Sequence, residues 1–196
     1  MHMMTLPNII TLSRIGLIPV FIALFYLQPN YLEGEPLAWI NNSLVAIFAL
    51  ISFTDFLDGL LARKLNQVSA LGAFLDPVAD KLMVCAALVL LTDYYQTWYI
   101  TIPSIIIISR EILVSALREW MGEVGKRANI TVSWIGKSKT FMQMFAILFL
   151  LYQQPLFIFS SKEIFSSGLF LLFSATILTL WSGFNYLKAG LKTFDS

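Results

Sequence analysis

Cysteine and histidine are almost missing from this sequence, which contains one of each, Cys85 and His2. A single cysteine can form no disulfide within the chain, and it cannot complete the usual cysteine and histidine ligands of a zinc site. Cys85 stands inside an apolar run, where a lone cysteine is typically a small buried hydrophobic residue. We assign no role to His2. The composition therefore excludes disulfide-rich folds, structural zinc sites and histidine-based catalysis.

Charged residues are also scarce, at 13% of the 196 residues, whereas soluble domains carry about 25%. Hydrophobic residues make up 58%, and the mean hydropathy is +0.75. Because a spanning helix takes about 20 apolar residues, the length allows about six spans and no separate soluble domain. We therefore predict one membrane domain over residues 1–196. The net charge of +1 gives no indication of a partner, and we expect no nucleic acid.

Six apolar segments predict an all-α fold with six transmembrane helices, because backbone polar groups in hydrocarbon must find partners inside a helix. The segments cover residues 6–27, 37–65, 70–94, 98–121, 132–152 and 164–191. The first begins with polar residues, and Pro19 would bend or break it. Two interpretations of this start stay open: a spanning helix from Leu6, or an N-terminal interfacial segment that precedes the membrane.

Lys and Arg fall on one side of the predicted membrane. The link at 28–36 and the link near Asp93 contain neither, and the link at 153–162 contains only Lys162. On the other side lie Arg63, Lys64, Lys81, Arg118, Lys126, Arg127, Lys137, Lys139, Lys188 and Lys192. Since basic links stay in the cytoplasm, we expect both termini and these links there.

Two pairs of aspartates flank the link between the second and third segments. Asp55 and Asp58 lie three residues apart and share a helix face with Gly59 and Ala62. In the next segment Gly72, Asp76 and Asp80 follow one another at intervals of four residues, which again gives one face. A short polar link makes the two helices antiparallel neighbours. The four carboxylates are therefore predicted to converge near the cytoplasmic interface.

Four clustered carboxylates repel one another unless cations lie between them. Oxygen ligands alone favour Mg²⁺, Mn²⁺ or Ca²⁺ over zinc. Two such ions ~4 Å apart can stabilise both the attacking and the leaving oxygen in phosphoryl transfer. The alternative is a set of purely structural acids. It is disfavoured because a carboxylate at membrane depth costs roughly 2.5–3.5 kcal/mol even on the lenient insertion scale.

A second group of charges follows in the fourth and fifth segments. Arg110, Glu111 and Arg118 lie roughly along one side of a helix, and Lys137 and Lys139 stand where the next helix starts. Cations beside an acidic metal site indicate a second anionic ligand, and a phosphorylated acceptor is the simple candidate. The competing interpretation is an internal ion pair of Glu111 with Arg110 or with Arg118.

The pattern Asp55-x2-Asp58-Gly59-x2-Ala62-Arg63-x8-Gly72-x3-Asp76-x3-Asp80 resembles the complete signature of the CDP-alcohol phosphatidyltransferase family. The resemblance implies a six-helix membrane enzyme that transfers a phosphatidyl group from CDP-diacylglycerol to an alcohol and releases CMP. It implies that two divalent cations, Mg²⁺ or Mn²⁺, are held by Asp55, Asp58, Asp76 and Asp80. Asp80 would also be the general base. The CDP-lipid would lie against Asp55, Asp58, Gly59, Ala62, Arg63 and Gly72.

Residues 6–14, 109–119 and 136–140 resemble the phosphatidylglycerophosphate synthase branch of this family. That resemblance implies glycerol 3-phosphate as the acceptor, with its phosphate bound by Arg110, Arg118, Lys137 and Lys139. It implies that Asn8, Thr11 and Arg14 approach the nucleotide or the headgroup. It further implies a homodimer in a bacterial inner membrane, with the active site facing the cytoplasm.

Three alternatives remain. A relative that uses inositol 1-phosphate needs a similar phosphate site, and a relative that uses phosphatidylglycerol takes a whole lipid as acceptor. A cation transporter would also carry intramembrane acids. However, transporters commonly contain internal repeats and midplane sites. This sequence has no evident repeat, and its aspartates are predicted near one interface.

Overall fold

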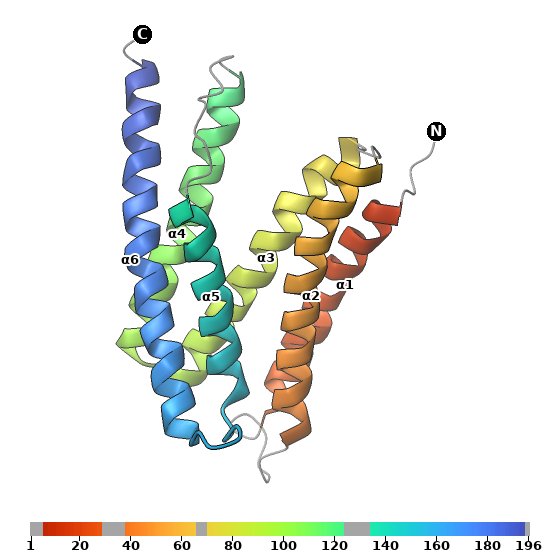
Figure 1. Ribbon diagram of the computed structural model, residues 1–196, viewed down its shortest axis with the longest axis vertical. Coiled ribbons are helices and arrows are strands. Elements are labelled where there is room, and N and C mark those ends of the chain that lie inside the picture. Colours follow the sequence, from red (N-terminus) through yellow and green to blue (C-terminus); the bar gives the residue numbers. More distant parts are fainter. Residues whose placement is uncertain (1–5, 29–37, 66–69, 124–133, 195–196) are drawn as a thin grey trace.

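The computed structural model describes residues 6–28, 38–65, 70–123 and 134–194, and these form six α-helices (Figure 1). The helices are α1 (Leu6–Tyr26), α2 (Ala38–Leu65), α3 (Ala70–Tyr95), α4 (Trp98–Glu123), α5 (Trp134–Tyr152) and α6 (Ser161–Phe194). Each predicted segment agrees with its helix to within three residues at both ends. The predicted all-α fold is therefore confirmed for the described residues.

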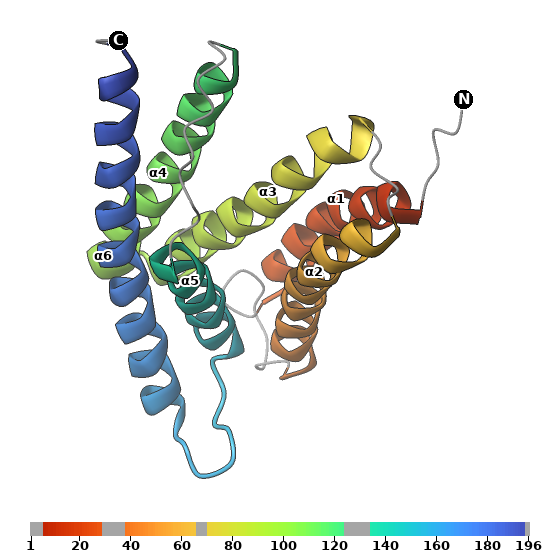
Figure 2. The same cartoon turned by 45° about the horizontal axis from the view of Figure 1, so that its top comes forward.

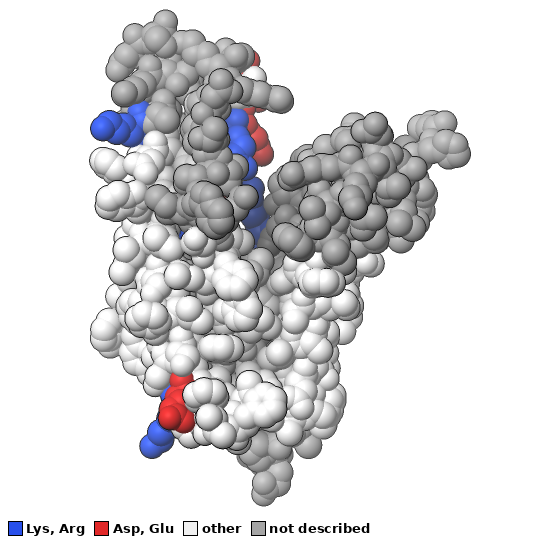
Figure 3. Space-filling model, in the orientation of Figure 1, with Lys and Arg blue, Asp and Glu red and all other residues white. Residues whose placement is uncertain are grey.

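Successive helices run up and down, so that α1 starts, α2 ends and α3 starts at the same end (Figures 1 and 2). The end of α4, the start of α5 and the end of α6 also point that way. This arrangement agrees with the predicted sorting of basic residues to one side. On the face in Figure 3, most Lys and Arg atoms lie toward that end, and a smaller group of basic and acidic atoms lies at the opposite end. Below them is a broad band with no described charged side chain.

Two helices, α4 and α6, are long and apolar enough to cross a membrane, over Trp98–Glu123 and Ser161–Lys188. Shorter apolar helical stretches cover Thr11–Tyr26, Ala38–Thr54 and Ser138–Tyr152. The share of apolar helix agrees with a bilayer as the surrounding solvent. By length and composition, two of the six predicted spans are thus identified in the described residues.

Of the bend or break predicted at Pro19, the break is wrong, because α1 runs without interruption from Leu6 to Tyr26. Proline inside a helix removes one intrahelical hydrogen bond and strains the preceding turn. Buried side chains on both sides of Pro19 hold the helix against its neighbours: Thr11, Arg14, Phe21 and Phe25 are at most 2% exposed. Packing along the whole helix therefore outweighs this local penalty.

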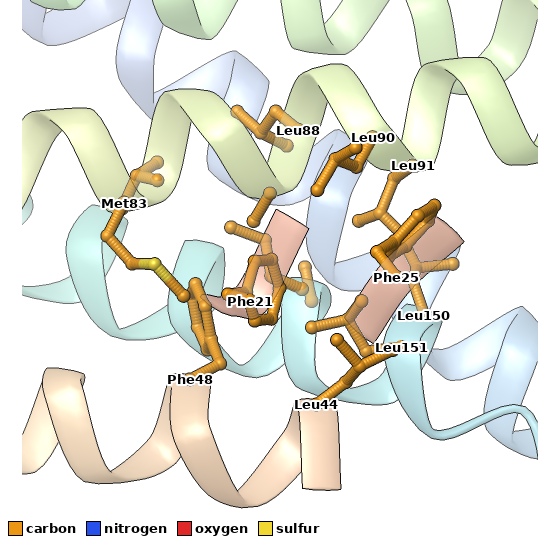
Figure 4. Close-up of a cluster of buried hydrophobic side chains, with 14 of the residues drawn as sticks. Phe21, Phe25, Leu44, Phe48, Met83, Leu88, Leu90, Leu91, Leu150 and Leu151 are labelled. Atoms are coloured by element: carbon orange, nitrogen blue, oxygen red, sulfur yellow. The ribbon is translucent and has the colours of Figure 1, made fainter. Parts of the chain in front are cut away.

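The core joins α1, α2, α3 and α5 (Figure 4). Leu44 and Phe48 lie one helical turn apart on α2 and face Phe21 of α1, whose ring centroid is 6.5 Å from that of Phe48. Met83 of α3 reaches toward Phe48, and Leu150 of α5 lies among the same side chains. Regular spacing on each helix puts these residues on one face. This core fixes the positions of α2 and α3, the two helices that carry the aspartates.

Helix α6 packs along α5 and α4 at close range. A Cβ atom on Gly168 would meet Cγ of Leu150 at 3.1 Å and Cβ of Phe149 at 3.2 Å. Small residues let membrane helices approach in this way, so that van der Waals contact replaces the missing hydrophobic driving force. At the far end, Tyr95 donates a hydrogen bond of 2.9 Å to the Leu150 carbonyl. These contacts tie α5 to α6 on one side and to α3 on the other.

Candidate active site

The four signature aspartates lie on two helices that contact each other. Asp55 and Asp58 belong to the last part of α2, and Asp76 and Asp80 to the first half of α3. Both helices are continuous through these positions, including Pro77, so the spacing that gives each pair one face is kept. Their side chains lie outside the described residues, and the metal-ligand assignment remains a prediction.

Other predicted residues also fall outside the description. The side chains in question are those of Asn8, Gly59, Ala62, Arg63, Gly72 and Lys137. Among the residues that the structure describes, no other group of three or more acidic, histidine or cysteine side chains could hold a metal ion. The described part of the chain therefore contains no alternative metal site made of such side chains.

Thr11 and Arg14 lie on the buried side of α1. They are 0% and 2% exposed, and they are three residues apart on the same face. Helix α1 packs against α2 and α3, so these polar groups face the helices that carry the aspartates. Buried polar and ionisable side chains in a membrane protein commonly mark a functional site. This burial agrees with the role predicted for Thr11 and Arg14, although it does not identify a ligand.

The second predicted group converges on one carboxylate. Oε1 of Glu111 accepts a hydrogen bond from Lys139 of α5 and lies 3.3 Å from Nη1 of Arg110. The ion pair of Glu111 with Arg110, predicted as the competing interpretation, is thus confirmed. Arg118 is exposed, and Glu111 pairs with the other two cations rather than with it. Of the four predicted phosphate ligands, the structure therefore brings Arg110 and Lys139 together.

Arg110 is held from the opposite side by α6. Its Nη2 donates a hydrogen bond of 2.8 Å to Oγ of Ser182, and its guanidinium lies 5.7 Å from the ring centroid of Tyr186. Gly183 leaves room for the Arg110 side chain, because a Cβ atom there would meet Cγ of Arg110 at 3.2 Å. A planar guanidinium fixed by a hydrogen bond, an aromatic face and a carboxylate is well oriented to bind the oxygens of an anionic ligand such as a phosphate.

Lys139 is only 3% exposed, and a cation so deeply buried needs a partner. Glu111 of α4 supplies it, reached by the long side chain of Lys139 from α5. A third cation, Lys81 of α3, joins through Ser115 of α4: Lys81 donates to Oγ of Ser115, which donates at 2.7 Å to the Glu111 carbonyl. Among the described side chains, two cations thus contact this carboxylate, and Lys81 acts on it from farther away, which leaves an excess of two positive charges (3 − 1).

Sequence reasoning missed Lys81, Ser115, Ser182 and Tyr186 as members of this group. Ser182 and Tyr186 stand four residues apart in a helix that is otherwise largely apolar, which is a recognisable polar face. Lys81 follows directly after the last aspartate of the signature. Nothing in the sequence, however, indicates which helices these faces meet.

Known proteins resemble this chain over almost its whole length. Residues 4–181 match the CDP-alcohol phosphatidyltransferase family. The chain is 46% identical over 184 residues to the CDP-diacylglycerol–glycerol-3-phosphate 3-phosphatidyltransferase of Salmonella typhimurium strain LT2, covering 94% of this chain and 93% of that protein. Identity to the protein of the same name from Escherichia coli strain K12 is 45%, with the same coverage. This chain belongs to the CDP-alcohol phosphatidyltransferase family.

Proposed function

We propose that the protein transfers the phosphatidyl group of CDP-diacylglycerol to sn-glycerol 3-phosphate, giving phosphatidylglycerophosphate and CMP. Relatives that carry the name of this activity match nearly the full chain. The structural observation that carries the choice of a phosphorylated acceptor is the pair of cations, Arg110 and Lys139, that meet at the Glu111 carboxylate. The reaction makes the protein a transferase of phospholipid biosynthesis, on the route to phosphatidylglycerol.

The donor side of the proposed site is the hairpin of α2 and α3. Asp55, Asp58, Asp76 and Asp80 would hold two divalent cations, Mg²⁺ or Mn²⁺. The residues fit such ions, because carboxylate oxygens are the ligands that hard cations prefer and two contacting helices carry them in pairs. When bound, such ions stabilise negative charge on the diphosphate and on the departing CMP.

Other donor contacts come from α2, α3 and α1. Gly59, Ala62, Arg63 and Gly72 would lie against the CDP group. Asn8, Thr11 and Arg14 would approach the nucleotide or the headgroup. Burial of Thr11 and Arg14 toward α2 and α3 supports this assignment.

The acceptor side is the cluster on α4 and α5, with Arg110, Arg118, Lys137 and Lys139 as the proposed phosphate ligands. A phosphate monoester carries about −1.5 to −2 charges at neutral pH, close in size to the surplus around Glu111. Inositol 1-phosphate carries a similar group, so this charge balance alone does not separate the two acceptors. Relatives named for glycerol 3-phosphate favour that acceptor.

The chemistry is a displacement at phosphorus. The acceptor hydroxyl oxygen bonds to the phosphorus that bears the diacylglycerol, and the bond from that phosphorus to the CMP oxygen breaks. Asp80 would take the hydroxyl proton as general base. Arg110 and Lys139 would hold the acceptor while this happens, since fixed orientation lowers the barrier of a two-substrate step.

We also propose the setting of this reaction. Residues 1–196 would form one domain with six spans in a bacterial cytoplasmic membrane, and α4 and α6 already have the length and apolarity of spans. The basic ends of the helices would face the cytoplasm, where glycerol 3-phosphate is available. A homodimer would be the assembled form.

The test is an acceptor panel with purified protein in detergent. CMP release from CDP-diacylglycerol is measured with glycerol 3-phosphate, inositol 1-phosphate or phosphatidylglycerol, each with and without a chelator. We expect release with glycerol 3-phosphate, loss of it in chelator, and recovery with Mg²⁺ or Mn²⁺. Preference for another acceptor would replace the proposed substrate. Cation flux into liposomes without CMP release would support a transporter instead.

A further inference from the structure

Lys81 is a cation to which the proposed function gives no part. It lies on α3 one residue after Asp80, and its side chain is half-buried. Its ammonium donates a hydrogen bond to Ser115, which is on α4. An ammonium has three donor hydrogens, so this bond orients the group without saturating it. Lys81 therefore points from the aspartate hairpin toward α4.

The group that Lys81 joins is the one around Glu111. Ser115 donates to the Glu111 carbonyl at 2.7 Å, while the Glu111 carboxylate accepts from Lys139 and Arg110. Lys81, Arg110 and Lys139 all act electrostatically on that carboxylate. Three helices thus each contribute one cation to a partly buried region in which Glu111 is the one anion among the described side chains. In such surroundings unbalanced charge is unfavourable, and an anionic ligand relieves it.

We propose that Lys81 binds the acceptor phosphate together with Arg110 and Lys139, and that Glu111 is the positioning residue that keeps the three cations in place before the phosphate arrives. The inference rests on the proposed function, because it names a further ligand of the same acceptor. One carboxylate reduces the repulsion among three cations without neutralising them. A phosphate dianion then matches the two charges that remain.

The position of Lys81 also gives the acceptor a direction. Consecutive residues of a helix differ in height by about 1.5 Å, so Lys81 and Asp80 lie at nearly the same level of α3. Consecutive side chains point about 100° apart around a helix, so a phosphate held by Lys81 is anchored at the level of the proposed base, on an adjoining side of α3. The rest of a small acceptor has only a short distance to span, and a rigid hold at one end favours reaction at the other.

A structural role is the competing explanation. Lys81 could simply tie α3 to α4 through Ser115, or mark the cytoplasmic side of the membrane. The two explanations differ in what the charge does. A structural tie needs only a hydrogen-bond donor at this position, whereas a phosphate ligand needs the positive charge.

The experiment compares Lys81→Gln, which keeps a donor, with Lys81→Arg, which keeps the charge. Lys162→Gln is the matched control, because Lys162 is exposed at the start of α6. Initial rates of CMP release are measured while glycerol 3-phosphate and CDP-diacylglycerol are varied in turn. Inorganic phosphate is included as a competitor of the acceptor.

We expect Lys81→Gln to raise the acceptor KM by about tenfold or more, the size expected for a lost charge-assisted hydrogen bond, with the donor KM near that of the unaltered protein. Inhibition by inorganic phosphate should weaken in parallel, Lys81→Arg should recover most of the affinity, and Lys162→Gln should change neither KM.

An acceptor KM that Lys81→Gln leaves unchanged overturns the inference while the proposed function stands. So does equal loss in Lys81→Gln and Ser115→Ala, since both would then act only through the tie between the helices. If Lys81→Gln does not fold, Lys81→Arg is the deciding variant. Loss of the fold in Lys81→Arg as well means a structural role and overturns the inference. A folded Lys81→Arg that keeps most of the acceptor affinity and the inhibition by inorganic phosphate supports it. Failure of the unaltered protein to use glycerol 3-phosphate would instead overturn the proposed function and the inference with it.

Discussion

Replacing Ser182 with alanine removes one of the three groups that hold Arg110. The Ser182 hydroxyl accepts a hydrogen bond of 2.8 Å from Nη2 of Arg110 and donates at 3.2 Å to the Thr179 carbonyl. The Arg110 side chain is 14% exposed, so little water is available to replace the lost partner. The change is small in volume and leaves α6 otherwise intact. It therefore tests whether α6 orients the guanidinium for the acceptor.

The expected loss of acceptor affinity depends on the contacts that Arg110 keeps in Ser182→Ala. A hydrogen bond to a charged group contributes about 1.5–3 kcal/mol. Glu111 stays 3.3 Å from Nη1, and the Tyr186 ring stays 5.7 Å from the guanidinium carbon, so Arg110 keeps two of its three supports. We therefore expect roughly half of these values, about 0.7–1.4 kcal/mol, in acceptor binding. This corresponds to an acceptor KM about three- to tenfold higher.

The assay measures CMP release at saturating CDP-diacylglycerol while glycerol 3-phosphate is varied. Ser174→Ala is the matched control, because Ser174 lies on the same helix and its hydroxyl donates to the Phe170 carbonyl of that helix. Both variants should have similar thermal midpoints. The reasoning is refuted if Ser182→Ala has the same acceptor KM as Ser174→Ala, or if it lowers kcat with no change in the KM of either substrate.

Two further predictions concern stability. Gly168→Leu should lower the thermal midpoint in detergent, because its Cβ would meet Leu150 at 3.1 Å and overpacking costs about 1–3 kcal/mol. Gly16→Leu is the control and should leave the thermal midpoint unchanged, because a Cβ atom at Gly16 would meet nothing within 4 Å. An equal loss in both variants would contradict the close contact. Lys139→Met should destabilise the protein by about 1.5–3 kcal/mol, because Glu111 loses one charged hydrogen-bond partner but keeps Arg110 at 3.3 Å. In a denaturation experiment Lys139→Met should cost less in a Glu111→Gln background than in the unaltered protein, and an equal cost in both backgrounds would contradict the pairing.

The helices were predictable because the bilayer makes apolar length a strong pattern. The boundary of α6 shows where the pattern is insufficient. The apolar run predicts a start at residue 164, but the helix begins at Ser161. Ser160 and Glu163 form a capping box: Glu163 accepts from the Ser160 backbone at 2.7 Å, and the Ser160 hydroxyl accepts from the Glu163 backbone at 3.4 Å. This motif was present in the sequence and would have corrected the boundary.

Spacing within one helix was equally informative about the site. The faces that carry the aspartates, and the face shared by Thr11 and Arg14, follow from helical periodicity alone. Contacts between helices do not, because the sequence gives no register of one helix on another. Ser182 stands 72 residues from Arg110, and its hydrogen bond to that side chain depends on how α6 lies along α4.

Glu111 illustrates the same limit. Its pairing with the neighbouring Arg110 was one of two predicted alternatives, since the two side chains are close in any helix. Its pairing with Lys139, 28 residues away, requires α5 to approach α4 at that height. The packing of the helices therefore makes Lys139 the second partner of the Glu111 carboxylate, while Arg118, on the same helix as Glu111, is exposed.

The account depends most directly on divalent cations bound by the α2–α3 hairpin. Mn²⁺ binding to purified protein, followed by electron paramagnetic resonance, tests it in Asp80→Asn and in Asp93→Asn, a control at the exposed far end of α3. We predict two Mn²⁺ per chain in the unaltered protein and in Asp93→Asn, with fewer ions and almost no CMP release in Asp80→Asn. Undiminished Mn²⁺ binding and CMP release in Asp80→Asn would contradict the account.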